Sequence, residues 1–171
     1  MRIYNFIAVL ALLLLPFPAE AQQVSALKSH DTRSPLDISA DHLELQQKQG
    51  RAIFSGKVKI TQAALTMTSE AVTVFYDLEK GSDKPTMQRL DARGGVVITS
   101  DSEEVTGEWG IYDIEERLIT LGGSVRMVRG DSLITGSRLE LDLTSGIIKM
   151  DGRNDPKKRV KGQFSVPEQE E

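Results

Sequence analysis

The chain has 171 residues, with 21 lysines and arginines against 25 aspartates and glutamates, and it contains no cysteine. The net charge of −4 argues against nucleic acid as a partner, because such binding calls for a basic face. The lack of cysteine excludes disulfides and a cysteine-linked lipid anchor. The length suits one domain, which would bury about two-thirds of its unfolded surface.

Residues 1–21 have the pattern of an export signal peptide. Arg2 supplies a positive charge, residues 6–15 are an unbroken apolar run, and Ala19-Glu20-Ala21 matches a small-residue cleavage site. The apolar run is too short to span a membrane, which needs about 20 residues. We therefore expect cleavage after Ala21, with an uncleaved anchor helix as the alternative. Residues 22–34 are polar and lack a period, so we expect a flexible lead.

Residues 36–150 alternate apolar and polar side chains almost throughout, which is typical of half-buried strands. Gly, Asp and Ser interrupt the alternation every few residues, and no window has a helical stripe. The pattern predicts an all-β domain. It is lost after residue 152, and the acidic residues 168–171 are expected to be a disordered tail.

The strand region contains an internal repeat. If Val58, Val96 and Val125 are taken as equivalent, a glycine stands two residues before each, and apolar residues stand two, nine and sixteen after. These are Gly56, Gly94 and Gly123; Ile60, Ile98 and Met127; Met67, Val105 and Ile134; Val74, Tyr112 and Leu141. A repeat of this kind buries its apolar face against its neighbours.

The repeat glycines have two interpretations. A step between strands can require a positive φ or a bulge, which glycine adopts at little cost. Alternatively, they are ordinary hairpin glycines. Both interpretations predict short antiparallel strands stacked unit on unit.

Strand parity predicts which side chains point inward, because residues two apart share a face. The outward set is polar and contains Lys57, Lys59, Thr66, Thr73, Arg126, Arg138, Glu140 and Lys149. The inward set is mostly aliphatic and contains Leu36, Ile38, Phe54, Val58, Ile60, Leu65, Met67, Val72, Val74, Val96, Ile98, Val105, Tyr112, Ile114, Leu121, Val125, Met127, Ile134, Leu139, Leu141, Ile148 and Met150. One apolar and one wet face suit an antiparallel sheet folded over on itself. From the residues alone, a closed core is favoured over a groove for acyl chains, because most apolar faces simply pack.

The sequence shows no pattern of catalytic or metal-binding residues. His30 and His42 lack a partner at metal-ligand spacing. The acidic groups Asp101, Glu103 and Glu104, and likewise Glu115-Glu116, are interpreted as solvated hairpin tips, without the buried setting of an acid–base pair. We predict no enzyme, no cofactor and no metal.

Three segments are similar to those of a known family. Residues 35–41 (PLDISAD) resemble the opening strand of the OstA-like domain. Residues 54–58 (FSGKV) are similar to its recurrent F-x-G-N-V step, and residues 122–125 (GGSV) form a second copy, with Lys57 and Ser124 at the Asn position. The chain thus resembles the LptA/OstA-like family of lipopolysaccharide-transport proteins over about residues 36–167.

This resemblance implies an open β-jellyroll over residues 35–167, in the periplasm, whose interior holds the acyl chains of lipopolysaccharide. It reverses the preference for a closed core. It also implies end-to-end self-association and a bridge between inner-membrane and outer-membrane components of the transport machinery. The first strand, 36–45, and the last, 147–150 with 160–166, would be the edges that join. The alternatives are an anchored inner-membrane component of the same pathway and a structural β-solenoid without a ligand.

The resemblance also implies lipid contacts. Leu36, Val96, Tyr112 and Ile114 match family positions. The other inward residues expected to bind lipid are Ile38, Phe54, Val58, Ile60, Met67, Val74, Ile98, Val105, Leu121, Val125, Met127, Ile134 and Leu141.

Overall fold

The computed structural model describes residues 31–77, 85–152 and 159–165. The expected signal peptide, most of the expected lead and the acidic tail lie outside these residues.

The described residues form one antiparallel sheet of ten strands. The long strands pair in chain order, and two short strands pair with the outermost long strand at each end. The strands are β1 (Asp37–Ser39), β2 (His42–Gln46), β3 (Arg51–Gln62), β4 (Leu65–Asp77), β5 (Thr86–Thr99), β6 (Glu103–Asp113), β7 (Leu118–Arg129), β8 (Ser132–Asp142), β9 (Ile148–Asp151) and β10 (Lys161–Gln163), with a 3-10 turn, η2 (Gln47–Gln49). The predicted all-β fold is confirmed, but β3 to β8 are long strands of 11 to 14 residues.

The repeat glycines mark β-bulges in the middle of the long strands. Gly56 in β3, Gly94 in β5 and Gly123 in β7 have φ values of 82°, 84° and 98°. The strand register shifts at each of them, so that two residues lie opposite one on the neighbouring strand. The bulge interpretation is therefore right, and the hairpin interpretation is wrong.

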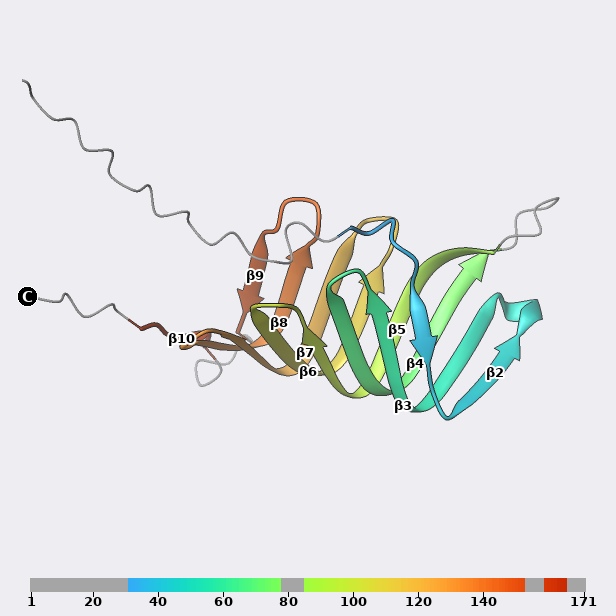
Figure 1. Ribbon diagram of the computed structural model, residues 1–171. Coiled ribbons are helices and arrows are strands. Elements are labelled where there is room, and N and C mark those ends of the chain that lie inside the picture. The colour runs from blue at the N-terminus through green and yellow to red at the C-terminus, as the bar shows by residue number, and fades with distance from the viewer. Residues whose placement is uncertain (1–30, 78–84, 153–158, 166–171) are drawn as a thin grey trace, which may run out of the picture.

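At the same line the neighbouring strands change the parity of their inward face. In β4 the buried residues are Met67 and Ser69 before the line, and Val72 and Val74 after it. The sheet therefore bends along one line, so that the two halves of each strand face each other (Figure 1). The buried apolar side chains lie between these halves. Half-sheet 1 contains β1, β10 and residues 58–62, 65–69, 96–99, 103–107, 125–129 and 132–136; half-sheet 2 contains β2, β9 and residues 51–55, 71–77, 86–93, 109–113, 118–122 and 138–142.

Carboxylates lie against the bulges. A bulge leaves a backbone N–H without a partner on the neighbouring strand, and a carboxylate oxygen can accept a hydrogen bond from it. Glu108 does this for β7: its Oε1 accepts from the Ser124 N–H at 3.2 Å and from the Ser124 hydroxyl at 3.1 Å. The pairs of acid and bulge glycine are Asp41 with Gly56, Glu70 with Gly94, and Glu108 with Gly123. Glu70 and Glu108 occupy equivalent positions in the repeat. The prediction from sequence, which was based on the apolar positions, did not include this regularity.

The space between the half-sheets is the core, and parity predicted it well. Every predicted inward residue is buried there or packs against the buried residues, and the predicted outward residues are exposed or half-buried. The prediction missed four buried residues that stand two or four places before a bulge glycine: Ala52, Leu90, Ala92 and Ile119. They continue the inward parity, but two are alanines, and Leu90 and Ile119 fall outside the offsets that define the repeat.

The predicted first strand, residues 36–45, is broken at Ala40 and Asp41. The Asp41 N–H donates to the Gly56 carbonyl at 2.9 Å, so the chain crosses the bend line there. As a result β1 pairs with one half of β3 and β2 with the other. The C-terminal end has the same arrangement, since β10 pairs with β8 in half-sheet 1 and β9 with β8 in half-sheet 2.

Gly94 and Gly95, adjacent in one bulge, differ in the space that a side chain would have. Gly94 and Gly95 both have positive φ, so an alanine at either should cost about 1–2 kcal/mol. A Cβ at Gly94 would lie 2.6 Å from the Glu70 Cβ, whereas a Cβ at Gly95 would meet nothing within 4 Å. We expect Gly94→Ala to lower the free energy of unfolding by about 1 kcal/mol more than Gly95→Ala, measured by urea denaturation. Equal losses would contradict the close contact with Glu70.

Candidate functional site

The N-terminal part of the interior is closed. Side chains of the two half-sheets meet there and leave a space of only about 20 Å³, roughly that of one water molecule. It is lined by Leu36, Ile60, Gln62, Leu65, Met67, Leu90, Ile98, Gly110, Ile111, Tyr112 and Ile119.

The C-terminal part of the interior is open. It holds a cavity of about 330 Å³, lined by Met127, Arg129, Ser132, Ile134, Ile148, Met150 and Phe164. This volume falls at the lower end of the range of ligand pockets, about 300–1,000 Å³. The interior therefore combines the two predicted states, a closed core at one end and an apolar cavity at the other. We call this space the C-terminal cavity.

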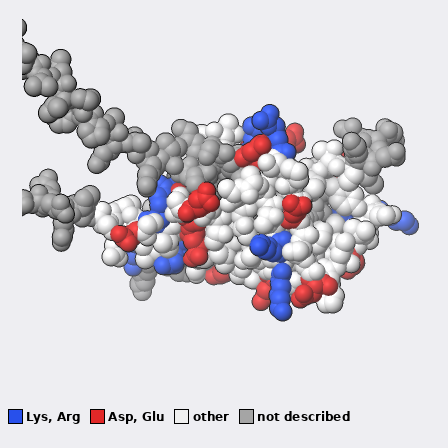
Figure 2. Space-filling model, in the orientation of Figure 1, with Lys and Arg blue, Asp and Glu red and all other residues white. Residues whose placement is uncertain are grey.

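A larger hollow, of about 560 Å³, lies outside the bend. Its walls are outward-facing and polar, with Thr106, Arg126, Thr135 and Lys161 in one cross-strand row and Glu108 nearby. Mixed charges also characterise the face in Figure 2, where acidic and basic side chains are interspersed among uncharged ones. A wet and mixed lining does not suit acyl chains, so we take the C-terminal cavity as the candidate site.

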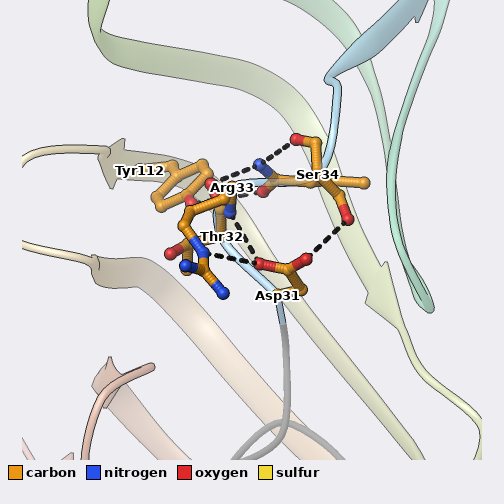
Figure 3. Close-up of polar contacts among 6 residues, drawn as sticks. Asp31, Thr32, Arg33, Ser34 and Tyr112 are labelled. Carbon is orange, nitrogen blue, oxygen red and sulfur yellow. Dashed lines mark hydrogen bonds and ion pairs between the residues drawn. The ribbon is translucent and has the colours of Figure 1, made fainter.

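A buried glutamine bridges the two half-sheets beside the closed part, and Figure 3 labels its partners Thr32, Ser34 and Tyr112. Gln62, at the end of β3, donates from Nε2 to the carbonyl oxygens of Thr32 and Ser34, both at 3.0 Å. Its Oε1 accepts from the hydroxyl of Tyr112, across the interior in half-sheet 2, at 3.2 Å. The described end of the N-terminal lead is thereby tied down. We call these contacts the Gln62 clasp.

Tyr112 is suited to its part in the clasp. Burial raises the pKa of the Tyr112 hydroxyl above its ordinary value, and the positive charge of Arg117 opposes that shift. The hydroxyl therefore stays protonated at neutral pH and can donate to Gln62.

An ion pair lies at the rim of the C-terminal cavity. Glu103, at the start of β6, pairs with Arg129, at the end of β7. Glu103 is only 5% exposed, so its prediction as a solvated hairpin tip was wrong. It shares the inward parity of Val105, which places its side chain between the half-sheets. Glu115 and Glu116 are exposed, as predicted.

The predicted lipid-binding residues all face the interior, but they differ in position. Met127 and Ile134 line the C-terminal cavity. Leu36, Ile60, Met67, Ile98 and Tyr112 surround the closed part. The others lie elsewhere in the core or pack against it: Ile38, Phe54, Val58, Val74, Val96, Val105, Ile114, Leu121, Val125 and Leu141. Their contact with lipid stays a prediction. Sequence reasoning missed Arg129, Ser132 and Phe164 as cavity residues, because none of them belongs to the apolar repeat.

Two further observations concern metals and membranes. His42 lies exposed on β2, and residues 31–77, 85–152 and 159–165 contain no group of three side chains able to hold a metal ion. In the same part of the chain, no helix has the length and apolar character needed to cross a bilayer.

Replacing Gln62 by leucine should weaken the clasp. The Tyr112 hydroxyl and two carbonyls would lose their partner, so we expect the free energy of unfolding to fall by about 1–3 kcal/mol. Urea denaturation measures this, with Gln88→Leu on the exposed side of β5 as the control. If both variants lose equally little, the clasp does not stabilise the fold.

Comparison with known proteins agrees with this geometry. Residues 37–147 match the family described as LptA/(LptD N-terminal domain) LPS transport protein. An uncharacterised protein of Rhizobium meliloti (strain 1021) is 30% identical over 121 residues, 68% of this chain and 65% of that protein. The chain thus spans slightly less than two thirds of that relative.

A second relative has a known fold. The lipopolysaccharide export system protein LptH of Pseudomonas aeruginosa is 23% identical over 144 residues, 66% of this chain and 79% of LptH. A crystal structure of LptH, described as the LptA homologous periplasmic component of the lipopolysaccharide transport device, matches with a TM-score of 0.68 at 18% identity, covering 80% of this chain and 99% of that one. The two share their fold. Because the family match extends over more than half of the chain, this protein belongs to the family of the LptA and LptD N-terminal-domain lipopolysaccharide transport proteins.

Proposed function

We propose that the protein is a periplasmic carrier that holds the acyl chains of lipopolysaccharide between its half-sheets and bridges the inner and outer membranes. The observation that carries the proposal is the apolar C-terminal cavity between two half-sheets that remain open at their ends. Membership of the transport family supports it.

The fold allows the interior to widen. The half-sheets are joined along the bend by the continuous backbones of the long strands, whereas beside the closed part the Gln62 clasp and side-chain packing hold them together. Spreading them breaks side-chain contacts but leaves strand-to-strand hydrogen bonds intact. Acyl chains that enter replace the lost apolar contacts, each buried Å² contributing about 25 cal/mol.

The two ends of the sheet support end-to-end bridging. At the N-terminal end, the edge strand β2 carries Leu43 and Leu45, which are 54% and 58% exposed. At the other end Ile147 and Phe164 are 56% and 66% exposed. Apolar side chains on open strand edges favour strand addition by another chain. In this proposal the N-terminal end accepts the inner-membrane component, and the C-terminal end accepts a second copy or the outer-membrane component.

Photo-crosslinking at two neighbouring positions tests lipid binding. Met150 lines the C-terminal cavity, and Lys149 next to it is exposed and predicted to face outward. We expect a photo-reactive side chain at Met150 to capture lipopolysaccharide in cells, and one at Lys149 to capture little, as judged by immunoblotting. No capture at Met150 would favour a structural β-solenoid, and equal capture would refute an interior lipid.

A charge at the N-terminal edge tests bridging. Leu45→Glu places a carboxylate on exposed β2 and should weaken self-association by about tenfold or more, because burying a charge in an apolar contact is costly. Sedimentation velocity over a range of concentrations measures it. Met87→Glu, at a 38% exposed position on β5 away from both ends, should have no effect. Equal behaviour of the two variants would remove the β2 edge from the bridge.

A further inference from the structure

We propose that Arg129, together with the C-terminal cavity, forms a subsite for an amphiphile with one acyl chain and a phosphate-bearing head group. The chain would occupy the apolar cavity, and the phosphate would bind the guanidinium at its rim. This inference rests on the proposed function and adds a head-group specificity to it.

Arg129 lies between the apolar cavity and the solvent. It is the last residue of β7 and pairs across strands with Glu103 on one side and Ser132 on the other. Arg129 and Ser132 are the polar members of a lining that is otherwise Met127, Ile134, Ile148, Met150 and Phe164. The side chain of Arg129 is 39% exposed, so it reaches from the apolar wall to water. One cation and one hydroxyl beside an apolar cavity complement an anionic amphiphile.

The ion pair with Glu103 holds the guanidinium of Arg129 in place. Glu103 holds one end of the guanidinium, and its own side chain is buried. A guanidinium has five donors, so the pair leaves other N–H groups to meet a ligand. Arginine binds phosphate with two parallel hydrogen bonds, a geometry that a fixed guanidinium presents well. Glu103 therefore acts as a positioning residue for Arg129.

Acidic residues near Arg129 reduce the net positive charge at the rim of the cavity. Glu103 offsets the charge of Arg129, and Asp131 lies in the turn that follows β7. Long-range attraction of anions is therefore weak, and discrimination must come from short hydrogen bonds to the guanidinium. The cavity volume of about 330 Å³, near the lower limit for ligand pockets, suits a single chain in the unspread protein.

Two probes with the same chain separate head-group from chain binding. Dodecyl phosphate and dodecyl maltoside, each below its micellar concentration, are titrated calorimetrically into the purified protein. Arg129→Gln should weaken dodecyl phosphate binding about tenfold and leave dodecyl maltoside unchanged. Glu103→Gln keeps an amide oxygen that can hold the guanidinium but removes the competing charge, so phosphate binding should strengthen several-fold.

Two control variants accompany these. Arg126→Gln, three residues earlier on β7 but outward-facing, should change neither probe. Arg129→Lys keeps a charge beside Glu103, and so protects folding, but should lose several-fold of phosphate affinity because an ammonium lacks the planar fork. Circular dichroism checks the fold of each variant.

The outcomes distinguish the two proposals. If dodecyl phosphate binds wild type, Arg129→Gln and Arg129→Lys equally, the head-group subsite is overturned and the apolar cavity stands. If wild type binds neither probe, the proposed lipid-binding function itself fails. If both probes lose affinity equally in Arg129→Gln, the residue shapes the cavity and does not read the head group.

Discussion

The line of β-bulges is the constraint on which the structure depends. An antiparallel strand of 11 to 14 residues would normally keep one face apolar along its whole length, and a flat sheet of such strands would expose that face to water. Here Gly56, Gly94 and Gly123 each insert an extra residue at positive φ, and the neighbouring strands change parity at the same level. The sheet bends there, and its two apolar halves cover each other.

Because one bent sheet makes both walls of the interior, the residues that pack the core are also the residues that would contact acyl chains in the proposed function. The walls touch at the N-terminal part, where the Gln62 clasp also joins them, and they separate around the C-terminal cavity. In the proposed carrier, acyl chains replace contacts between the walls, so hydrogen bonds between the walls, such as that of the Gln62 clasp, must be few. Aliphatic contacts suit this task, because they are non-directional and an acyl chain can replace them.

The same construction gives the described sheet an edge at each end, as the proposed bridging requires. A repeat that stacks without closing leaves an edge at each end. At each edge the short strands lie on both sides of the bend, so that each half-sheet ends in its own short strand: β1 and β2 at one end, β10 and β9 at the other. Exposed leucines on β2 and exposed Ile147 and Phe164 at the far end give these edges an apolar character. An added strand would extend both walls and continue the apolar space between them.

The all-β class, the repeat and nearly the whole inward face could be predicted from the amino-acid sequence, because period-two alternation and glycine spacing are local properties. Even the parity change was present in the offsets, since Met67 and Val74 stand an odd number of residues apart. Where the interior is closed and where it is open depends instead on how the two half-sheets pack in three dimensions. It also buried Glu103 beside Arg129 and placed Phe164 at the cavity. These features depend on which side chains meet across two half-sheets, and those contacts join residues far apart in the chain, which no local pattern records.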